Sequence, residues 1–215
     1  MAQARRKGSR RPTATKSRLP FVIIGSAIAI ALVIAIIATR ESGTEDTTLA
    51  QTRPVTVNGK ALPTLSDTGT DAGVGRVAPG LEGAAFDGTA ISIANDGRPK
   101  IVVFVAHWCP HCQVEVPLIT KWIAANGKPS GVDMYGVSTG VSKDRPNYPP
   151  SSWLAEENWP LPTLADSDDA TAAQAYGLNA YPYFAVVNAA GNLVFRATGE
   201  LNTTQLAQLV TLAKS

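Results

Sequence analysis

Cysteine, histidine and charged side chains are all scarce in this chain of 215 residues. It has two Cys and two His, and 17% of its residues are charged. Two cysteines exclude a disulfide-dense scaffold. The apolar fraction of 45% in turn excludes a wholly disordered chain. The length suits one folded domain with an appendage.

The small net charge of +2 hides an uneven distribution. Seven of the 19 Lys and Arg lie in residues 1–18, where there is no acidic side chain, so the rest of the chain carries 12 basic side chains against 17 acidic ones. A nucleic-acid-binding domain carries a basic face in its folded part. We therefore expect no nucleic-acid partner, and we interpret residues 1–18 as a basic cytoplasmic tail.

An uncharged apolar run follows the basic tail, from Phe21 to Ala38. As a helix it reaches roughly 27 Å, close to the ~30 Å hydrocarbon core of a bilayer, and residues 19 and 20 extend it. A cleaved signal peptide is the alternative, but its apolar region is usually shorter and ends in a small-x-small site, where this chain has isoleucine. Because the positive charge precedes the run, the N-terminus is predicted to be cytoplasmic. The sequence thus predicts a single-pass cell-membrane protein anchored by residues 19–38, with its remainder extracytoplasmic.

Residues 39–76 are rich in Thr, Gly and Asp and show no sustained apolar period, which predicts a flexible linker. Residues 77–215 are predicted to form the folded domain. Its expected elements are a hairpin about residues 86–89, a buried strand over 100–106, a helix over 110–126, a strand over 132–137, helices over 152–158 and 168–176, strands over 183–188 and 193–198, and a last helix capped by Asn202. This order predicts an α/β sandwich with a mixed sheet.

The motif Cys109-Pro-His-Cys112 lies where the buried strand turns into the helix. A cysteine at a helix N-terminus is close to unpaired N–H groups and the positive end of the dipole, both of which favour the thiolate. One turn later, Cys112 faces the same way and can close a disulfide with Cys109. Cys109 is the expected exposed nucleophile and Cys112 the shielded partner that releases the bound substrate. These positions predict redox chemistry.

A static disulfide or half of a zinc site is the alternative for this motif. His107 and His111 join the two cysteines within six residues. So short a segment cannot wrap a tetrahedral ion alone, and the rest of the chain holds no further Cys or His. We therefore predict no metal, and interpret His107 as a surface or sheet-end residue.

The stretch over residues 104–117 resembles the active-site signature of the thioredoxin superfamily, and more narrowly that of the membrane-anchored TlpA/ResA-like thiol–disulfide oxidoreductases. The resemblance covers roughly residues 77–215. It implies a thioredoxin-like three-layer sandwich with a central mixed β-sheet, preceded here by one N-terminal transmembrane helix. Pro117 matches the proline that kinks the active-site helix, and Glu115 matches the acidic residue of this branch. Pro182, after Tyr181, matches the cis-proline of the superfamily.

Three positions depart from the superfamily pattern. Val103 stands where thioredoxin keeps a buried Asp, which leaves Glu115 as the candidate proton relay, with a solvated helix charge as the alternative. Tyr181 is larger than the residue usual before the cis-proline, and we expect it to cap the disulfide. His111 is typical of DsbA-type oxidants, and by favouring the Cys109 thiolate it favours an oxidising disulfide. An ionised Glu115 would act oppositely, so the direction of electron flow stays open.

The predicted function is an extracytoplasmic, membrane-anchored thiol–disulfide oxidoreductase. Its catalytic residues are predicted to be Cys109, Cys112, His111 and Glu115, and its substrate-binding residues Trp108, Tyr181 and Pro182. The expected partners are thiol or disulfide protein substrates and a membrane redox protein that resets the dithiol; no cofactor is expected. A peroxiredoxin is disfavoured because Ala106 stands where that family needs Thr or Ser. A copper-delivery protein of the same fold is disfavoured because such proteins resemble C-x-x-x-C with a distant His.

Overall fold

A computed structural model describes residues 49–215 of the chain. The predicted basic tail (1–18) and the predicted anchor (19–38) lie outside these residues. Within residues 49–215, no helix is both long enough and apolar enough to cross a bilayer.

A five-stranded mixed sheet forms the centre of the described part, in the order β6-β5-β4-β7-β8. Its strands are β4 (Lys100–Val105), β5 (Asp133–Ser138), β6 (Thr163–Ala165), β7 (Tyr183–Val187) and β8 (Leu193–Thr198). Strands β4, β5 and β6 run parallel, whereas β7 is antiparallel to β4 and β8 is antiparallel to β7. The sheet is therefore mixed, as the sequence predicts.

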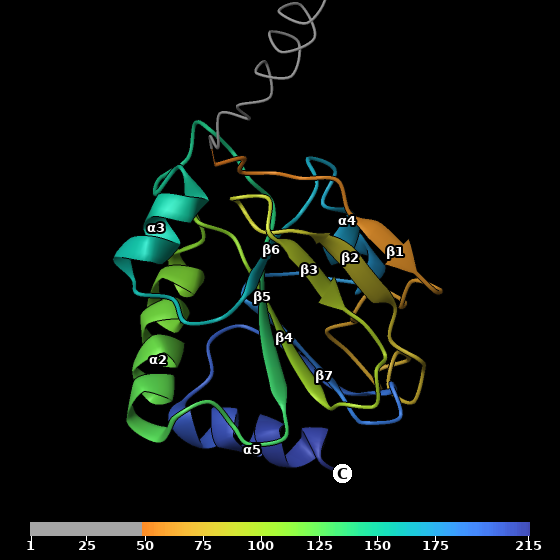
Figure 1. Ribbon diagram of the computed structural model, residues 1–215. Coiled ribbons are helices and arrows are strands. Elements are labelled where there is room, and N and C mark those ends of the chain that lie inside the picture. The colour runs from red at the N-terminus through yellow and green to blue at the C-terminus, as the bar shows by residue number, and fades with distance from the viewer. Residues whose placement is uncertain (1–48) are drawn as a thin grey trace, which may run out of the picture. The chain divides into compact units, whose positions relative to one another are not determined.

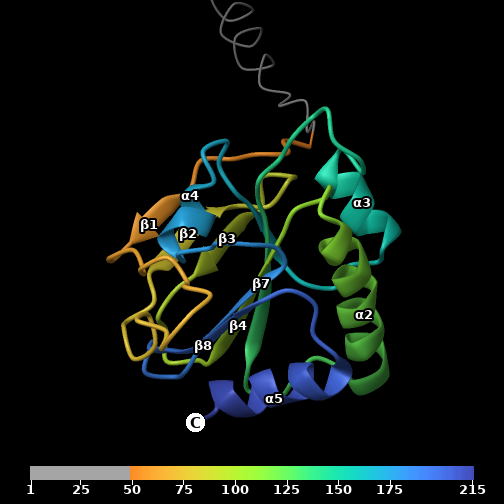
Figure 2. The same ribbon diagram turned by 180° about the vertical axis from the view of Figure 1, so that it is seen from behind.

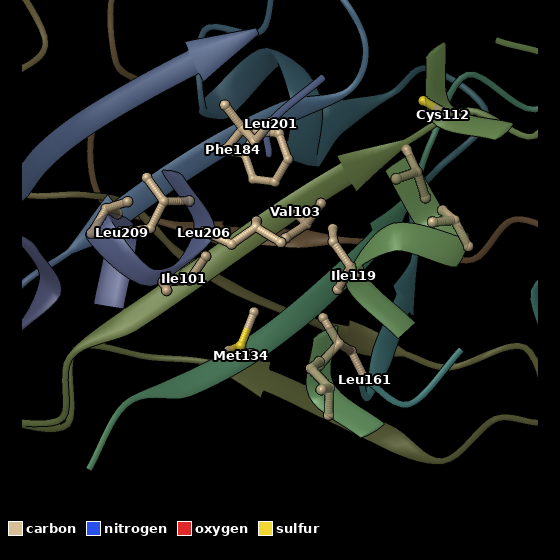
Figure 3. Close-up of a cluster of buried hydrophobic side chains, with 14 of the residues drawn as sticks. Ile101, Val103, Cys112, Ile119, Met134, Leu161, Phe184, Leu201, Leu206 and Leu209 are labelled. Carbon is tan, nitrogen blue, oxygen red and sulfur yellow. The ribbon is translucent and has the colours of Figure 1, made fainter. Parts of the chain in front are cut away.

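The central strand β4 is buried along its whole length because helices or strands cover both faces of the sheet. Its side chains alternate between two apolar clusters. Ile101 and Val103 belong to the cluster between the sheet and the helices α2 (Pro110–Asn126) and α5 (Thr203–Ala213), which Figure 3 shows. Val102 and Phe104 belong to the cluster on the other face. This two-sided burial explains why β4 is a continuous apolar run.

Two outer layers cover the sheet (Figure 1). On one face, helices α2, α5 and α3 (Pro150–Glu156) contribute residues to the first cluster together with the sheet. The other layer holds α4 (Thr171–Ala175) and a separate antiparallel sheet of β1 (Thr56–Asn58), β2 (Gly80–Ala84) and β3 (Ala90–Ile93), which Figure 2 shows from behind. The hairpin predicted about residues 86–89 joins β2 to β3. A thioredoxin-like three-layer arrangement is thus confirmed.

The predicted linker over residues 39–76 is wrong for its described part, residues 49–76. Within it, β1 pairs with β2, and Leu62 lies in the second apolar cluster with 4% of its surface exposed. The Leu62 N–H also donates to the Ala175 carbonyl of α4. The segment shows no amphipathic period because only single residues and backbone groups attach it to the rest of the fold. These contacts show that the folded unit starts well before residue 77.

Candidate active site

Cys109 and Cys112 lie where β4 passes into α2. Cys109 is the N-cap residue of α2, and Pro110 takes a first-turn position where its missing N–H costs no hydrogen bond. Both thiols are free. In Figure 3, Cys112 lies beyond the carboxyl end of β4. The strand–helix junction therefore presents both sulfurs at one end of the sheet.

Both thiols are buried, and for Cys109 this is more enclosed than the sequence predicts. Cys112 has no exposed surface, as expected of the shielded partner, and burial raises the pKa of its thiol. Cys109 was expected to be exposed, yet only 6% of its surface is accessible. Trp108 and Tyr181 pack against the same cluster. Cys109 is thus the more accessible sulfur, but access to it is narrow.

The segment before β7 meets the start of α2. The Cys109 thiol donates to the Tyr181 carbonyl, with 3.7 Å between sulfur and oxygen. The Tyr181–Pro182 peptide bond is cis. Two of the predicted substrate-binding residues therefore lie at the dithiol, brought there from a position 72 residues away in the chain.

Trp108, the third predicted substrate-binding residue, is held from three sides. Its indole N–H donates to the Gly140 carbonyl at 2.7 Å. The ring meets Tyr181 edge-on, with 5.8 Å between ring centroids. The guanidinium of Arg145 lies 4.7 Å from its centroid, in cation–π geometry. Trp108 is therefore a fixed surface next to Cys109.

Glu115 is fully buried, so the alternative of a solvated helix charge is wrong. Its Oε2 accepts the Leu201 N–H at 2.9 Å, and its Oε1 has no partner among the described residues. Burial raises the pKa of Glu115 to about 7, against the lowering effect of the Leu201 hydrogen bond. A carboxyl group that changes protonation near neutral pH is suited to proton transfer.

The two histidines have separate partners. His111 is exposed, with its Nδ1 2.7 Å from Oε1 of Glu200. His107 is fully buried rather than at the surface. Its Nδ1 is 2.6 Å from the Pro146 carbonyl and its Nε2 accepts the Ser142 N–H at 3.2 Å, which fixes a neutral ring with its proton on Nδ1. Burial lowers the pKa of His107. The two His and two Cys therefore do not form one ligand set.

Sequence reasoning missed Arg145, Glu200 and the role of His107. Arg145 and Glu200 reach the site from loops that lie 36 and 91 positions after Cys109 in the chain. His107 stands two residues before the motif, but nothing in the sequence indicates its bonds to residues 142 and 146. Only tertiary contacts place these three side chains.

A three-layer α/β sandwich with a dithiol at the carboxyl end of a central strand defines a thioredoxin-like protein. The Redoxin family model matches residues 57–212, and the chain belongs to that family. The match includes residues 57–76, in agreement with the early start of the fold.

Curated relatives are about 30% identical to this chain over the aligned segments. The soluble secreted antigen MPT53 of Mycobacterium tuberculosis is 29% identical over 115 residues, which cover 54% of this chain and 60% of that protein. The thiol:disulfide interchange protein DsbE homolog of Paracoccus denitrificans is 30% identical over 131 residues, which cover 60% of this chain and 68% of that protein. The match thus spans less than two thirds of MPT53.

Solved structures support the fold. A thiol:disulfide interchange protein of the thioredoxin family from Chlorobium tepidum TLS has a TM-score of 0.53 and 21% identity, covering 72% of this chain and 99% of its own. At this identity the likeness concerns the fold alone.

Proposed function

We propose that this protein is a thiol–disulfide oxidoreductase that acts on protein substrates through Cys109 and Cys112. The observation that carries the proposal is the pair of free thiols at the start of α2, with the Tyr181 carbonyl on Cys109 and the Glu115 carboxyl group buried one turn after Cys112. The name of the Paracoccus relative supports the same class.

In the reducing direction, the Cys109 thiolate attacks one sulfur of a substrate disulfide. A Cys109–substrate disulfide forms and the other substrate sulfur leaves as a thiolate. Cys112, once deprotonated, attacks Cys109, which closes the Cys109–Cys112 disulfide and releases the second substrate thiolate. Two electrons pass from the protein dithiol to the substrate. The oxidising direction is the reverse, with the same mixed disulfide.

Glu115 is proposed as the base that takes the Cys112 proton in the second step. Burial disfavours the Cys112 thiolate, so this step needs an acceptor nearby. A carboxyl group with a pKa of about 7 is ionised often enough to accept that proton and acidic enough to lose it again. Glu115 is thus assigned a catalytic role beside the two cysteines.

Trp108, Tyr181 and Pro182 are proposed to bind the substrate segment that carries the reacting cysteine. Trp108 supplies a flat apolar surface beside Cys109, and the Tyr181 carbonyl oxygen is an acceptor at hydrogen-bond reach of the reacting sulfur. His111 is proposed to tune the dithiol from the first turn of α2. Its contact with Glu200 places a carboxylate against the imidazole, which offsets the stabilisation that a cationic His111 gives the thiolate.

Trapping tests the activity. A Cys112→Ala variant cannot release its substrate, so it should accumulate proteins joined to Cys109 by a disulfide. These adducts should be absent in the Cys109→Ala variant and should disappear when a reductant is added. Equal adducts on both variants would refute Cys109 as the nucleophile.

Residues 19–38 are proposed to anchor the protein in the cell membrane, with residues 1–18 in the cytoplasm and the dithiol outside. The proposal rests on the charge asymmetry about the apolar run. A membrane redox protein would then reset the dithiol. In intact cells, a membrane-impermeant thiol reagent should label reduced Cys109; labelling only after lysis would show the opposite orientation.

A further inference from the structure

The loop between β5 and α3, residues 139–149, is held against the active site by the buried side chain of His107. His107 bonds to it twice, through the Pro146 carbonyl and the Ser142 N–H. The side chain of Asn147 donates back to the His107 carbonyl at 3.0 Å. His107 thereby links the end of β4 to both ends of the segment from 142 to 147, and acts as a positioning residue for this loop.

The same loop reaches the residue next to the nucleophile. The Gly140 carbonyl accepts the Trp108 indole N–H, and the Arg145 guanidinium lies over the Trp108 ring. Trp108 in turn contacts Tyr181, whose carbonyl accepts the Cys109 thiol. A continuous set of contacts thus joins the guanidinium of Arg145 to the sulfur of Cys109.

Within the described residues, the positive charge of Arg145 is not neutralised by a neighbouring acidic side chain. It is exposed, and among residues 49–215 no carboxylate pairs with its guanidinium. Glu200, the acidic group on the other side of the motif, is occupied by His111. Neighbouring Lys143 and Asp144 are exposed and opposite in sign. The fixed charge beside Trp108 is therefore positive.

We propose that Arg145 is a specificity-determining residue that favours substrate segments with an acidic side chain next to the reacting cysteine. A segment lying on Trp108 with its sulfur at Cys109 brings its flanking side chains to the guanidinium. A carboxylate there gains a charge-assisted contact, and a basic side chain is repelled. The inference names the substrate class of the proposed oxidoreductase and rests on that function.

Peptide exchange tests the proposal in the full chain carrying Cys112→Ala. The probes are three peptides identical except for an Asp, Ser or Lys beside a single cysteine, each activated as a mixed disulfide with 2-thiopyridine. The Cys109 thiolate attacks the peptide sulfur, a protein–peptide disulfide forms, and the thiopyridine leaves as its thione, whose absorbance gives the rate. We expect the Asp peptide to react roughly five to ten times faster than the Lys peptide at low salt, and the ratio to shrink as salt is added.

Arg145→Ala should bring that ratio close to one, and Arg145→Glu should invert it. Lys143→Glu makes the same change of charge in the same loop away from Trp108, and should keep most of the preference. A ratio near one in the parent, a preference retained in Arg145→Glu, or an equal effect of Lys143→Glu would overturn the role of Arg145. Failure of Cys109 to react with any of the peptides would instead refute the proposed oxidoreductase function.

Discussion

Glu115 is the residue proposed to accept the Cys112 proton, so its own protonation state matters for the proposed chemistry. Its carboxyl group has no exposed surface and one hydrogen bond, to the Leu201 N–H. The unpartnered Oε1 is free to take a proton. Because the pKa of Glu115 is about 7, the group is partly ionised at neutral pH, whereas burial keeps the Cys112 thiol protonated. The two groups therefore differ in charge state for the same physical reason, which is loss of water.

Glu115→Gln should slow substrate release from the Cys109 mixed disulfide by about 100-fold at neutral pH. In the parent protein, the release rate should rise with pH through about 7, since only ionised Glu115 accepts a proton. The variant should lack this rise. Rapid-mixing measurement of single-turnover substrate release across pH 5–9 would show both the slowing and the loss of the pH dependence. Glu156→Gln, an exposed change in α3, is the control. An unchanged pH profile in Glu115→Gln would contradict the role.

The same substitution should change the pH dependence of stability. A carboxyl group whose pKa is raised by folding stabilises the folded state fully below its unfolded value of about 4.5, and that contribution is lost as pH rises through about 7. Glu115→Gln should remove this loss and gain on the order of 1–3 kcal/mol at pH 8 relative to the parent. Urea unfolding of the parent and the variant at pH 5 and pH 8 measures the loss of stability in the parent and the gain in the variant. A parent protein whose stability does not fall between these values would contradict the burial of an ionisable Glu115.

Elements with their own start and stop signals are predicted well from the sequence. Helix α2 has the predicted bounds because Pro110 begins it and Gly127, at φ +75°, ends it. The cap of α5 is also confirmed: the Asn202 side-chain oxygen accepts the Gln205 N–H, and the Gln205 side-chain oxygen accepts the Asn202 N–H. Such signals are local, so the sequence carries them.

Elements that depend on distant partners are predicted poorly. Strand β6 has three residues and follows two prolines, and it forms only because β5 lies beside it. Strand β1 likewise depends on β2. In the site, the cysteine spacing, Glu115 and Pro182 are predicted from the sequence. The loop that brings in Arg145 is not, because nothing in the loop's sequence indicates that a buried His107 holds it.

The segment from 62 to 77 is attached by a buried ion pair, which Asp71→Asn should break. Asp71 Oδ2 accepts the Arg196 Nε–H at 2.9 Å, and Asp71 Oδ1 pairs with the second guanidinium nitrogen. The Arg196 side chain has no exposed surface. Loss of the carboxylate leaves a buried cation without its counter-charge, so we expect a loss of about 2–4 kcal/mol in urea unfolding at pH 7.

The size of the Asp71 effect should depend on pH. The hydrogen bond from Arg196 holds the pKa of Asp71 below its ordinary value, so the stabilisation is present above the unfolded pKa of about 4 and is lost as pH falls through the lower folded value. The matched control is Asp67→Asn, an exposed site in the same segment, which should change stability by less than about 0.5 kcal/mol. Equal effects of the two substitutions would contradict a special role of the ion pair.

At the scale of the whole described unit, two apolar clusters lie on opposite faces of one sheet, and only one of them contacts the dithiol. The cluster with Cys109 and Cys112 is built from the sheet and from residues after position 100. The other cluster needs Leu62, from the segment that the sequence indicates as a linker. Backbone hydrogen bonds attach that segment to the rest of the fold in several places. The Ala50 N–H donates to the Phe86 carbonyl, and the Leu65 N–H donates to the Gly177 carbonyl. The site therefore rests on a sheet whose far face is closed by the N-terminal part of the unit.

The start of the folded unit can be found by truncation. A chain of residues 47–215 retains β1, Leu62 and Asp71, so it should unfold in one cooperative transition with the midpoint of the full chain.

A chain of residues 77–215 loses the edge strand beside β2, uncovers Leu81, and leaves the Arg196 guanidinium without its carboxylate. Each of these costs on the order of 2–4 kcal/mol, and together they equal most of the stability of a domain of this size. The shorter chain should therefore lack a cooperative transition in urea and show a collapsed dispersion of its amide NMR signals. A chain of residues 62–215, which keeps Leu62 and Asp71 but not β1, should fold with an intermediate midpoint. If residues 77–215 alone unfolded at the midpoint of residues 47–215, the segment before residue 77 would be a linker after all.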